Sequence, residues 1–109
     1  FLPLSFGKHK KVTAVMNDKI LEAIGILQEE CAEVIQIVSK CRRFGIDELH
    51  LKEGVKNREL LNEEIGDILA IVDYLIDQNV ITVGELEQAK AKKVNKLKSW
   101  STLFHSNRV

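Results

Sequence analysis

Two stretches of this chain decide its fold: ILEAIGILQEECAEVIQIVSKC at residues 20–41 and LLNEEIGDILAIVDYL at residues 60–75. Both carry apolar residues at alternating steps of four and three, which is the spacing of one face of an α-helix. In the first stretch these residues are Ile20, Ile24, Leu27, Cys31, Val34, Val38 and Cys41. In the second they are Leu61, Ile65, Ile68, Val72 and Leu75. The sequence therefore predicts two long amphipathic helices that bury these rows.

Beside each apolar row runs a second row that holds two carboxylates, three residues apart. The first of these rows reads Ala23, Ile26, Glu30, Glu33 and Ile37, and the second reads Leu60, Glu64, Asp67, Ile71 and Tyr74. Acids in half-buried rows repel one another and lose hydration, so they need a compensating positive charge. A hard divalent cation such as Mg²⁺ supplies it most simply, because it prefers carboxylate oxygens. If the helices pack antiparallel, the spacing predicts that all four acids converge.

Two other interpretations of the acids remain in competition with a metal site. The first is a solvated helix face, since glutamate is common in helices. The second is a carboxylate-bridged di-iron bundle, which needs a histidine three residues after a glutamate. The histidines at positions 9, 50 and 105 do not have that spacing. Glu29 and Glu63 lie one position outside the acid rows and suit the orientation of water better than direct coordination.

Size and charge restrict the function classes. The chain has 109 residues, which fits one domain, with 16 basic and 16 acidic side chains. Zero net charge gives no overall field that would attract nucleic acid or a membrane, so neither is expected as a partner. Cys31 and Cys41 lie about 15 Å apart along one predicted helix and cannot pair within a chain. Unpaired thiols favour a reducing, cytoplasmic location.

The helix boundaries follow from capping signals. Asn17 caps the first helix, which runs to Phe44 before Gly45, and Asn57 caps a second at residues 58–78. A capping box at residues 82–85 opens a third helix that reaches about residue 100, and a short helical turn fits between the first two. We expect residues 1–15 to form a leader outside a single domain at residues 16–109.

The predicted helices are too long for a compact domain of this size. Helices of 20 to 27 residues measure roughly 30 to 40 Å, whereas a chain of this length has a radius of gyration of about 13 Å. A single copy would leave much of each apolar stripe in water. The predicted fold is therefore an all-α helical bundle completed by oligomerisation, as a homodimer or a homotetramer.

The string EECAE at residues 29–33, followed by EIGD at 64–67, resembles the EExxE and ExxD signature of the MazG-like nucleoside triphosphate pyrophosphohydrolases. The resemblance covers residues 17–100, and SKCRRFG at 39–45 together with the loop at 54–57 is similar to a small, phage-associated branch. It implies an all-α MazG-like bundle that binds Mg²⁺ through Glu30, Glu33, Glu64 and Asp67, with Mn²⁺ as a substitute. The implied reaction hydrolyses a nucleoside triphosphate between the α and β phosphates, releasing a monophosphate and pyrophosphate.

The remaining candidate residues would serve proton transfer and substrate binding. Either Glu33 or Glu29 could accept the proton of the attacking water. Lys40 and Arg43 could meet a polyphosphate tail, although cations also favour a helix C-terminus for electrostatic reasons. Further candidates for substrate contacts are Asn57, Lys92, Asn95 and Lys98. The structural alternatives are an N-cap for Asn57 and a solvated face for the residues at 92–98, and Trp100 is either a packing anchor or a base-stacking ring.

Two alternatives to the enzyme stay open. The first is a helical interaction or regulatory module that keeps the fold without turnover. The second is a nucleic-acid binder that uses the lysines of residues 90–98, against which the zero net charge argues.

Overall fold

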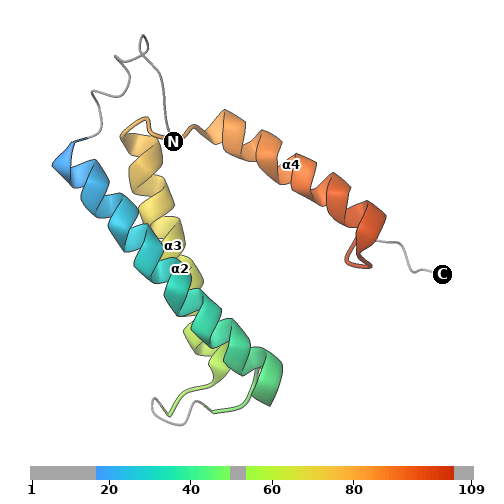
Figure 1. Ribbon diagram of the computed structural model, residues 1–109. Coiled ribbons are helices and arrows are strands. Elements are labelled where there is room, and N and C mark those ends of the chain that lie inside the picture. The colour runs from blue at the N-terminus through green and yellow to red at the C-terminus, as the bar shows by residue number, and fades with distance from the viewer. Residues whose placement is uncertain (1–16, 50–53, 105–109) are drawn as a thin grey trace. The chain divides into compact units, whose positions relative to one another are not determined.

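The computed structural model describes residues 17–49 and 54–104, and its regular structure there consists of three helices (Figure 1). They are α2 (Asp18–Phe44), α3 (Asn57–Asp77) and α4 (Val83–Trp100). The predicted all-α class is thus confirmed for the described residues. The predicted leader lies outside them. The described part of the α2–α3 connection forms turns and one isolated bridge pair, Leu49 with Lys56, rather than a helical turn.

The helix ends form where the capping signals predict them. The Asn17 side-chain oxygen accepts a hydrogen bond from the backbone N–H of Ile20 at 2.9 Å, which satisfies one free donor of the first turn of α2. Gly45 ends α2 with φ of 109°, a conformation that strains any residue with a Cβ. At the start of α4, the Thr82 hydroxyl accepts from the Glu85 N–H at 3.2 Å, as a capping box requires.

The start of α3 differs from the prediction. Asn57 is the first residue of the helix rather than its cap, and it is fully buried. Its Nδ2 donates to the Gly45 carbonyl at 3.0 Å, and its backbone N–H donates to the Glu48 carbonyl at 2.9 Å. The side chain therefore ties α3 to the end of α2 across the turn.

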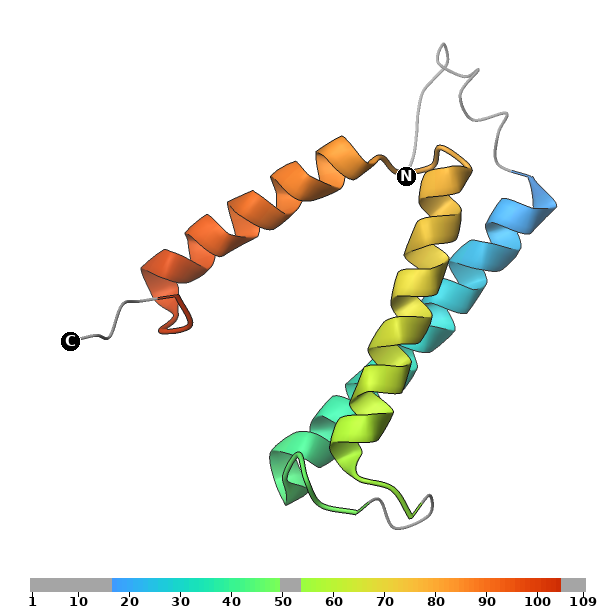
Figure 2. The same cartoon turned by 180° about the vertical axis from the view of Figure 1, so that it is seen from behind.

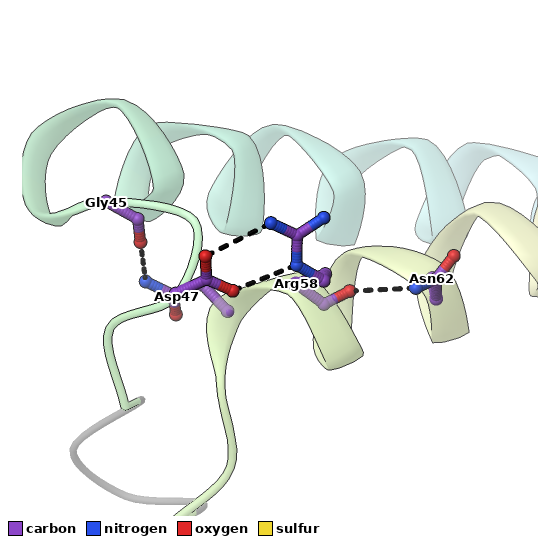
Figure 3. A network of polar contacts seen from close by, with 5 residues as sticks. Gly45, Asp47, Arg58 and Asn62 are labelled. Carbon is purple, nitrogen blue, oxygen red and sulfur yellow. Dashed lines mark hydrogen bonds and ion pairs between the residues drawn. The ribbon is translucent and has the colours of Figure 1, made fainter.

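A paired arginine and aspartate close the same turn from the solvent side (Figure 3). The Arg58 guanidinium donates to both carboxylate oxygens of Asp47, at 2.9 and 3.1 Å. This hydrogen-bonded contact lowers the pKa of Asp47 and raises that of Arg58. The two hydrogen bonds fix the orientation of the Arg58 side chain relative to Asp47. They add little to the stability of the fold, because both side chains are exposed.

Helices α2 and α3 lie side by side and antiparallel, as both views show (Figures 1 and 2). On each helix one row of buried and half-buried residues recurs at steps of three and four, and we call the two rows together the seam. On α2 the seam comprises Ile20, Ala23, Leu27, Glu30, Val34, Ile37 and Cys41. On α3 it comprises Asn57, Leu61, Glu64, Ile68, Ile71 and Leu75. Full burial of one of the large aliphatic side chains contributes about 1.5–3 kcal/mol, so the ends of the seam, around Ile20 and Leu75 and around Ile37, hold the pair together.

The prediction of which row is buried is wrong in part. Ile24, Cys31 and Val38 are exposed, whereas Ala23 and Ile37, from the row beside them, are buried. The predicted row and the seam share Ile20, Leu27, Val34 and Cys41, so periodicity alone does not distinguish them. The consequence is that Glu30 lies in the seam itself rather than beside it.

The chain divides into two units, one that ends at Leu75 and one that begins at Ile76 and contains α4. The first unit is the α2–α3 hairpin. Within α4, the half-buried residues are Leu86, Val94 and Leu97, which give it a narrow apolar stripe. None of the three helices in the described residues combines bilayer-spanning length with a sufficiently apolar composition.

Alanine substitutions at two glycines test the backbone conformation of the turn that ends α2. Gly45→Ala places a Cβ at φ of 109° and should lower the free energy of unfolding by about 1–3 kcal/mol. Gly66→Ala, in the interior of α3 with no atom within 4 Å of the added Cβ, should raise it by about 1 kcal/mol. Urea denaturation of both variants measures the difference. Equal effects of the same sign would contradict the assigned turn.

Candidate functional site

Three carboxylates from two helices meet in the hairpin. Glu30 on α2 and Glu64 and Asp67 on α3 each offer one oxygen, and these oxygens all lie within 4.8 Å of one another. We call this group the acidic cluster. Glu30 and Glu64 are seam residues, so the apolar packing above and below them brings the two acids together. Asp67 reaches the same point because it lies three residues, almost one turn, beyond Glu64.

The acidic cluster is partly withdrawn from water. Glu30 and Glu64 are half-buried, whereas Asp67 is exposed. The Oε1 atom of Glu64 is buried and has no hydrogen-bond partner. A buried carboxylate oxygen without a partner is destabilising, because it has lost its hydration and gained nothing in exchange. A cation or a hydrogen-bond donor that pairs with this oxygen would offset that cost.

The environment raises the pKa of Glu64 from the ordinary 4.5 to about 7. Loss of hydration is the largest cause, followed by hydrogen bonding with Glu30 and by its charge. The charges of Glu33 and Asp67 raise the pKa further. At neutral pH, Glu64 thus exchanges its proton readily, and a cation that binds here would displace that proton.

Of the four acids predicted to converge, Glu33 is outside the cluster. It is exposed on the flank of α2. Glu33 follows Glu30 by three residues, a rotation about 60° short of a full turn, so the two side chains point in different directions. Its charge nevertheless acts on Glu64. Glu29 is exposed on α2 as well. Both glutamates thus remain accessible to solvent near the cluster.

The basic candidates on α2 lie toward its C-terminal end. Lys40 is half-buried and Arg43 is exposed, and Lys40 follows Glu33 by about 10 Å along the helix axis. The Arg43 guanidinium lies over the Phe44 ring, 4.9 Å from its centroid. An exposed contact of this kind contributes about 0.5–1 kcal/mol, so a phosphate could displace it.

Asn57 has a structural role in this conformation. Its amide is 1% exposed, and Nδ2 already donates to the Gly45 carbonyl. Oδ1 is buried without a partner. We therefore assign Asn57 to the turn rather than to substrate binding.

The candidates on α4 belong to the second unit. Lys92, Asn95 and Lys98 are exposed and follow one another at steps of three, so they share one side of α4. Lys93 lies over the Trp100 ring at 5.4 Å from its centroid, and Trp100 is itself largely exposed. The ring is thus accessible on this helix, and its contact is with a lysine rather than with an apolar core.

Sequence reasoning missed the contact between Asp47 and Arg58. The two residues are eleven positions apart across a turn, and no periodic pattern links them. The only sequence signal for this contact was an acidic residue near the start of the loop and a basic residue just after its end.

The sequence of this chain is similar to part of several known proteins. Several curated bacterial proteins match, all with the name UDP-N-acetylglucosamine--N-acetylmuramyl-(pentapeptide) pyrophosphoryl-undecaprenol N-acetylglucosamine transferase. The protein from Bacillus cereus is 35% identical over 81 residues, which cover 69% of this chain and 23% of that protein. The protein from Bacillus anthracis is 33% identical over the same length. The chain thus spans about a quarter of the length of these relatives. No family model and no solved structure matches.

The raised pKa of Glu64 predicts a pH-dependent stability when divalent cations are removed with EDTA. Because Glu64 binds its proton more tightly in the folded state, at a pKa of about 7 against 4.5, it stabilises the fold most below about pH 4.5. This contribution is lost as the pH rises through about 7. Between about pH 5 and pH 8 the free energy of unfolding should fall by about 1–2 kcal/mol, since water screens part of the effect.

Two substitutions isolate that contribution. Glu64→Gln should remove the fall, because the amide does not titrate. Glu63→Gln changes the same charge at an exposed neighbouring position and should leave the fall in place. Urea denaturation at the two pH values gives the comparison, and a parent protein that matches Glu64→Gln at both would show that Glu64 is not perturbed.

Proposed function

We propose that this chain is a Mg²⁺-dependent nucleoside triphosphate pyrophosphohydrolase that cleaves between the α and β phosphates. The products would be a nucleoside monophosphate and pyrophosphate, which suits the clearing of a nucleotide pool. The observation that carries the proposal is the convergence of Glu30, Glu64 and Asp67 around a buried oxygen that has no partner. The resemblance of EECAE and EIGD to the MazG-like signature supports it.

The donor set fits a hard divalent cation. All three cluster residues offer carboxylate oxygens, which Mg²⁺ and Mn²⁺ prefer, and the exposure of Asp67 leaves one side open to water and phosphate. Glu33 lies close enough to act on Glu64 electrostatically and would complete the set of four. Bound Mg²⁺ would neutralise charge on the phosphate oxygens and lower the pKa of a bound water.

The other residues of the chain would supply proton transfer and substrate orientation. Glu33 or Glu29, both exposed beside the cluster, would accept the proton of the attacking water. Arg43 would leave the Phe44 ring to hold phosphate oxygens with its planar guanidinium, and Lys40 would add a compact charge. For Lys92, Asn95 and Lys98 on α4, the contact with phosphate or base stays a prediction of the sequence.

The second candidate is a non-catalytic helical interaction or regulatory module. The observation that favours it is the local match to about a quarter of the length of the curated transferases, because a segment shared with longer proteins can serve as a module. The two candidates differ in turnover: a module binds partners but does not release pyrophosphate from a triphosphate.

A metal titration tests the proposal first. Isothermal titration with Mg²⁺ should show binding that strengthens as the pH rises through about 7, because Glu64 must lose its proton. Glu64→Gln and Asp67→Asn should weaken binding by about 100-fold or more. Glu59→Gln, which changes the same charge at an exposed position in the first turn of α3, is the matched control and should bind like the parent protein. Equal binding by all four proteins would remove the basis of the proposal.

A substrate panel then identifies the bond that is cut. Canonical and modified triphosphates are incubated with Mg²⁺, and pyrophosphate and orthophosphate are measured separately. Pyrophosphate should be the primary product, and Glu64→Gln should reduce kcat/KM by at least about 100-fold. Orthophosphate as the primary product would indicate a different reaction, and no turnover together with Mg²⁺ binding would favour the module.

A further inference from the structure

Tyr74 lies on the same side of the hairpin as the accessible part of the acidic cluster. Glu33, Asp67 and Tyr74 each precede a seam residue by one position, which turns their side chains about 100° away from the seam. Because α2 and α3 are antiparallel, a backward step of one residue turns both helices toward the same side (Figures 1 and 2). We call this side, formed by the residues that directly precede seam residues, the open side.

Tyr74 is within reach of a ligand bound at the acidic cluster. It follows Asp67 by seven residues, almost two turns, so its Cα lies about 10 Å farther along the axis of α3. Helical side chains lean toward the N-terminus of their helix, so the Tyr74 ring leans back toward the cluster. Tyr74 is half-buried, and its hydroxyl makes no hydrogen bond within the described part of the chain. The side chain therefore keeps accessible surface on the open side.

The surface between the acidic cluster and Tyr74 carries small and apolar side chains. On α3, Ala70 is the residue of the open side between Asp67 and Tyr74, and its methyl group adds little bulk. On α2, Ile26 is half-buried on the open side, one turn before Glu30. Since the helices are antiparallel, Ile26 is level with the turn of α3 that follows the cluster. These neighbours suit a sugar and a base better than a phosphate.

The opposite direction along the hairpin carries the positive charge that a polyphosphate needs. Lys40 lies on the open side toward the C-terminal end of α2, and Arg43 lies in the last turn. At the N-terminal end of α2, which is level with the tyrosine ring, Asp18 and Glu22 outweigh the charge of Lys19. A nucleotide held at the cluster would therefore direct its phosphates toward Lys40 and its nucleoside the other way.

We propose that Tyr74 stacks on the nucleobase of the substrate and that the nucleoside lies along α3, between the acidic cluster and this ring. The inference rests on the proposed pyrophosphohydrolase function, because the cluster must hold the metal and the α-phosphate. One sugar separates that phosphate from the base, so the base extends beyond the cluster. An aromatic ring stacks on every base, since each base has a π face. Tyr74 therefore favours a nucleotide over a polyphosphate that lacks a base.

The other aromatic rings of the described residues fit this position less well. Phe44 lies about 21 Å from Glu30 along α2, and its ring is in contact with the Arg43 guanidinium. Trp100 and Phe104 belong to the second unit of the chain. Within the described hairpin, Tyr74 is the aromatic residue that shares a helical row with the acids of the cluster.

Isothermal titration in the presence of Mg²⁺ tests the inference with two kinds of probe. The four standard deoxynucleoside monophosphates carry a base without a polyphosphate, and inorganic tripolyphosphate carries phosphates without a base. Tyr74→Leu keeps an apolar side chain but removes the ring, so it should weaken monophosphate binding by about 5- to 100-fold and leave tripolyphosphate binding unchanged. Tyr74→Phe keeps the ring and should bind both like the parent protein. Trp100→Leu removes another accessible ring and is the matched control, with parent affinity for both.

Several results would overturn the role of Tyr74 and leave the metal site in place. They are parent affinity for the monophosphates in Tyr74→Leu, a loss in Trp100→Leu instead, and a parent protein that binds tripolyphosphate but no monophosphate. Weaker binding of Mg²⁺ and tripolyphosphate by Tyr74→Leu would show a structural role and would overturn it too. A parent protein that binds neither Mg²⁺ nor tripolyphosphate would contradict the proposed function itself, and the inference with it.

Turnover gives a second measurement. With a triphosphate that the parent protein hydrolyses, Tyr74→Leu should raise KM by about 5- to 100-fold and change kcat little, because stacking holds the substrate and the transition state alike. Glu64→Gln should instead lower kcat, since it acts at the metal. A Tyr74→Leu protein with a lower kcat and an unchanged KM would overturn the assignment of Tyr74 to the base.

Discussion

The seam between α2 and α3 is the constraint on which the rest of this structure depends. Apolar residues at both ends hold two antiparallel helices at close distance, and Glu30 and Glu64 occupy seam positions between them. Neither acid would be half-buried on an isolated helix. The packing energy of the apolar layers therefore offsets the loss of hydration at the acids and keeps their carboxylates within reach of one another.

The turn between the helices sets the register in which the seam closes. The Asn57 amide and the Arg58 backbone N–H bind carbonyls at the end of α2, and the Asp47 carboxylate holds the Arg58 side chain. A slip of one residue along α3 would turn Glu64 about 100° away from Glu30. Local hydrogen bonds at one end of the hairpin thereby determine whether the acidic cluster forms near its middle. This explains why a buried amide, rather than a solvent-exposed cap, begins α3.

Sequence patterns predicted the helices well because helix ends depend on local chemistry. Asn17, Gly45 and Thr82 act through bonds to residues at most four positions away. The buried row was harder to identify, since the rows through Ala23 and through Ile24 are both apolar and only the partner helix decides between them. The pairing of Glu30 with Glu64 and Asp67 was predictable from their spacing, whereas the exclusion of Glu33 depends on the rotation of α2 about its axis. The roles of Asn57 and Asp47 are tertiary and leave no periodic signal.

The hairpin has two chemically different sides, and only one of them suits the proposed chemistry. The side that bears Glu33 and Asp67 is acidic and open, as a site for a metal and a phosphate must be. The side that bears Leu21, Ile35 and Leu69 is apolar. Because burial is the largest cause of the raised pKa of Glu64, the packing of α2 against α3 along the seam sets the electrostatic character of the site.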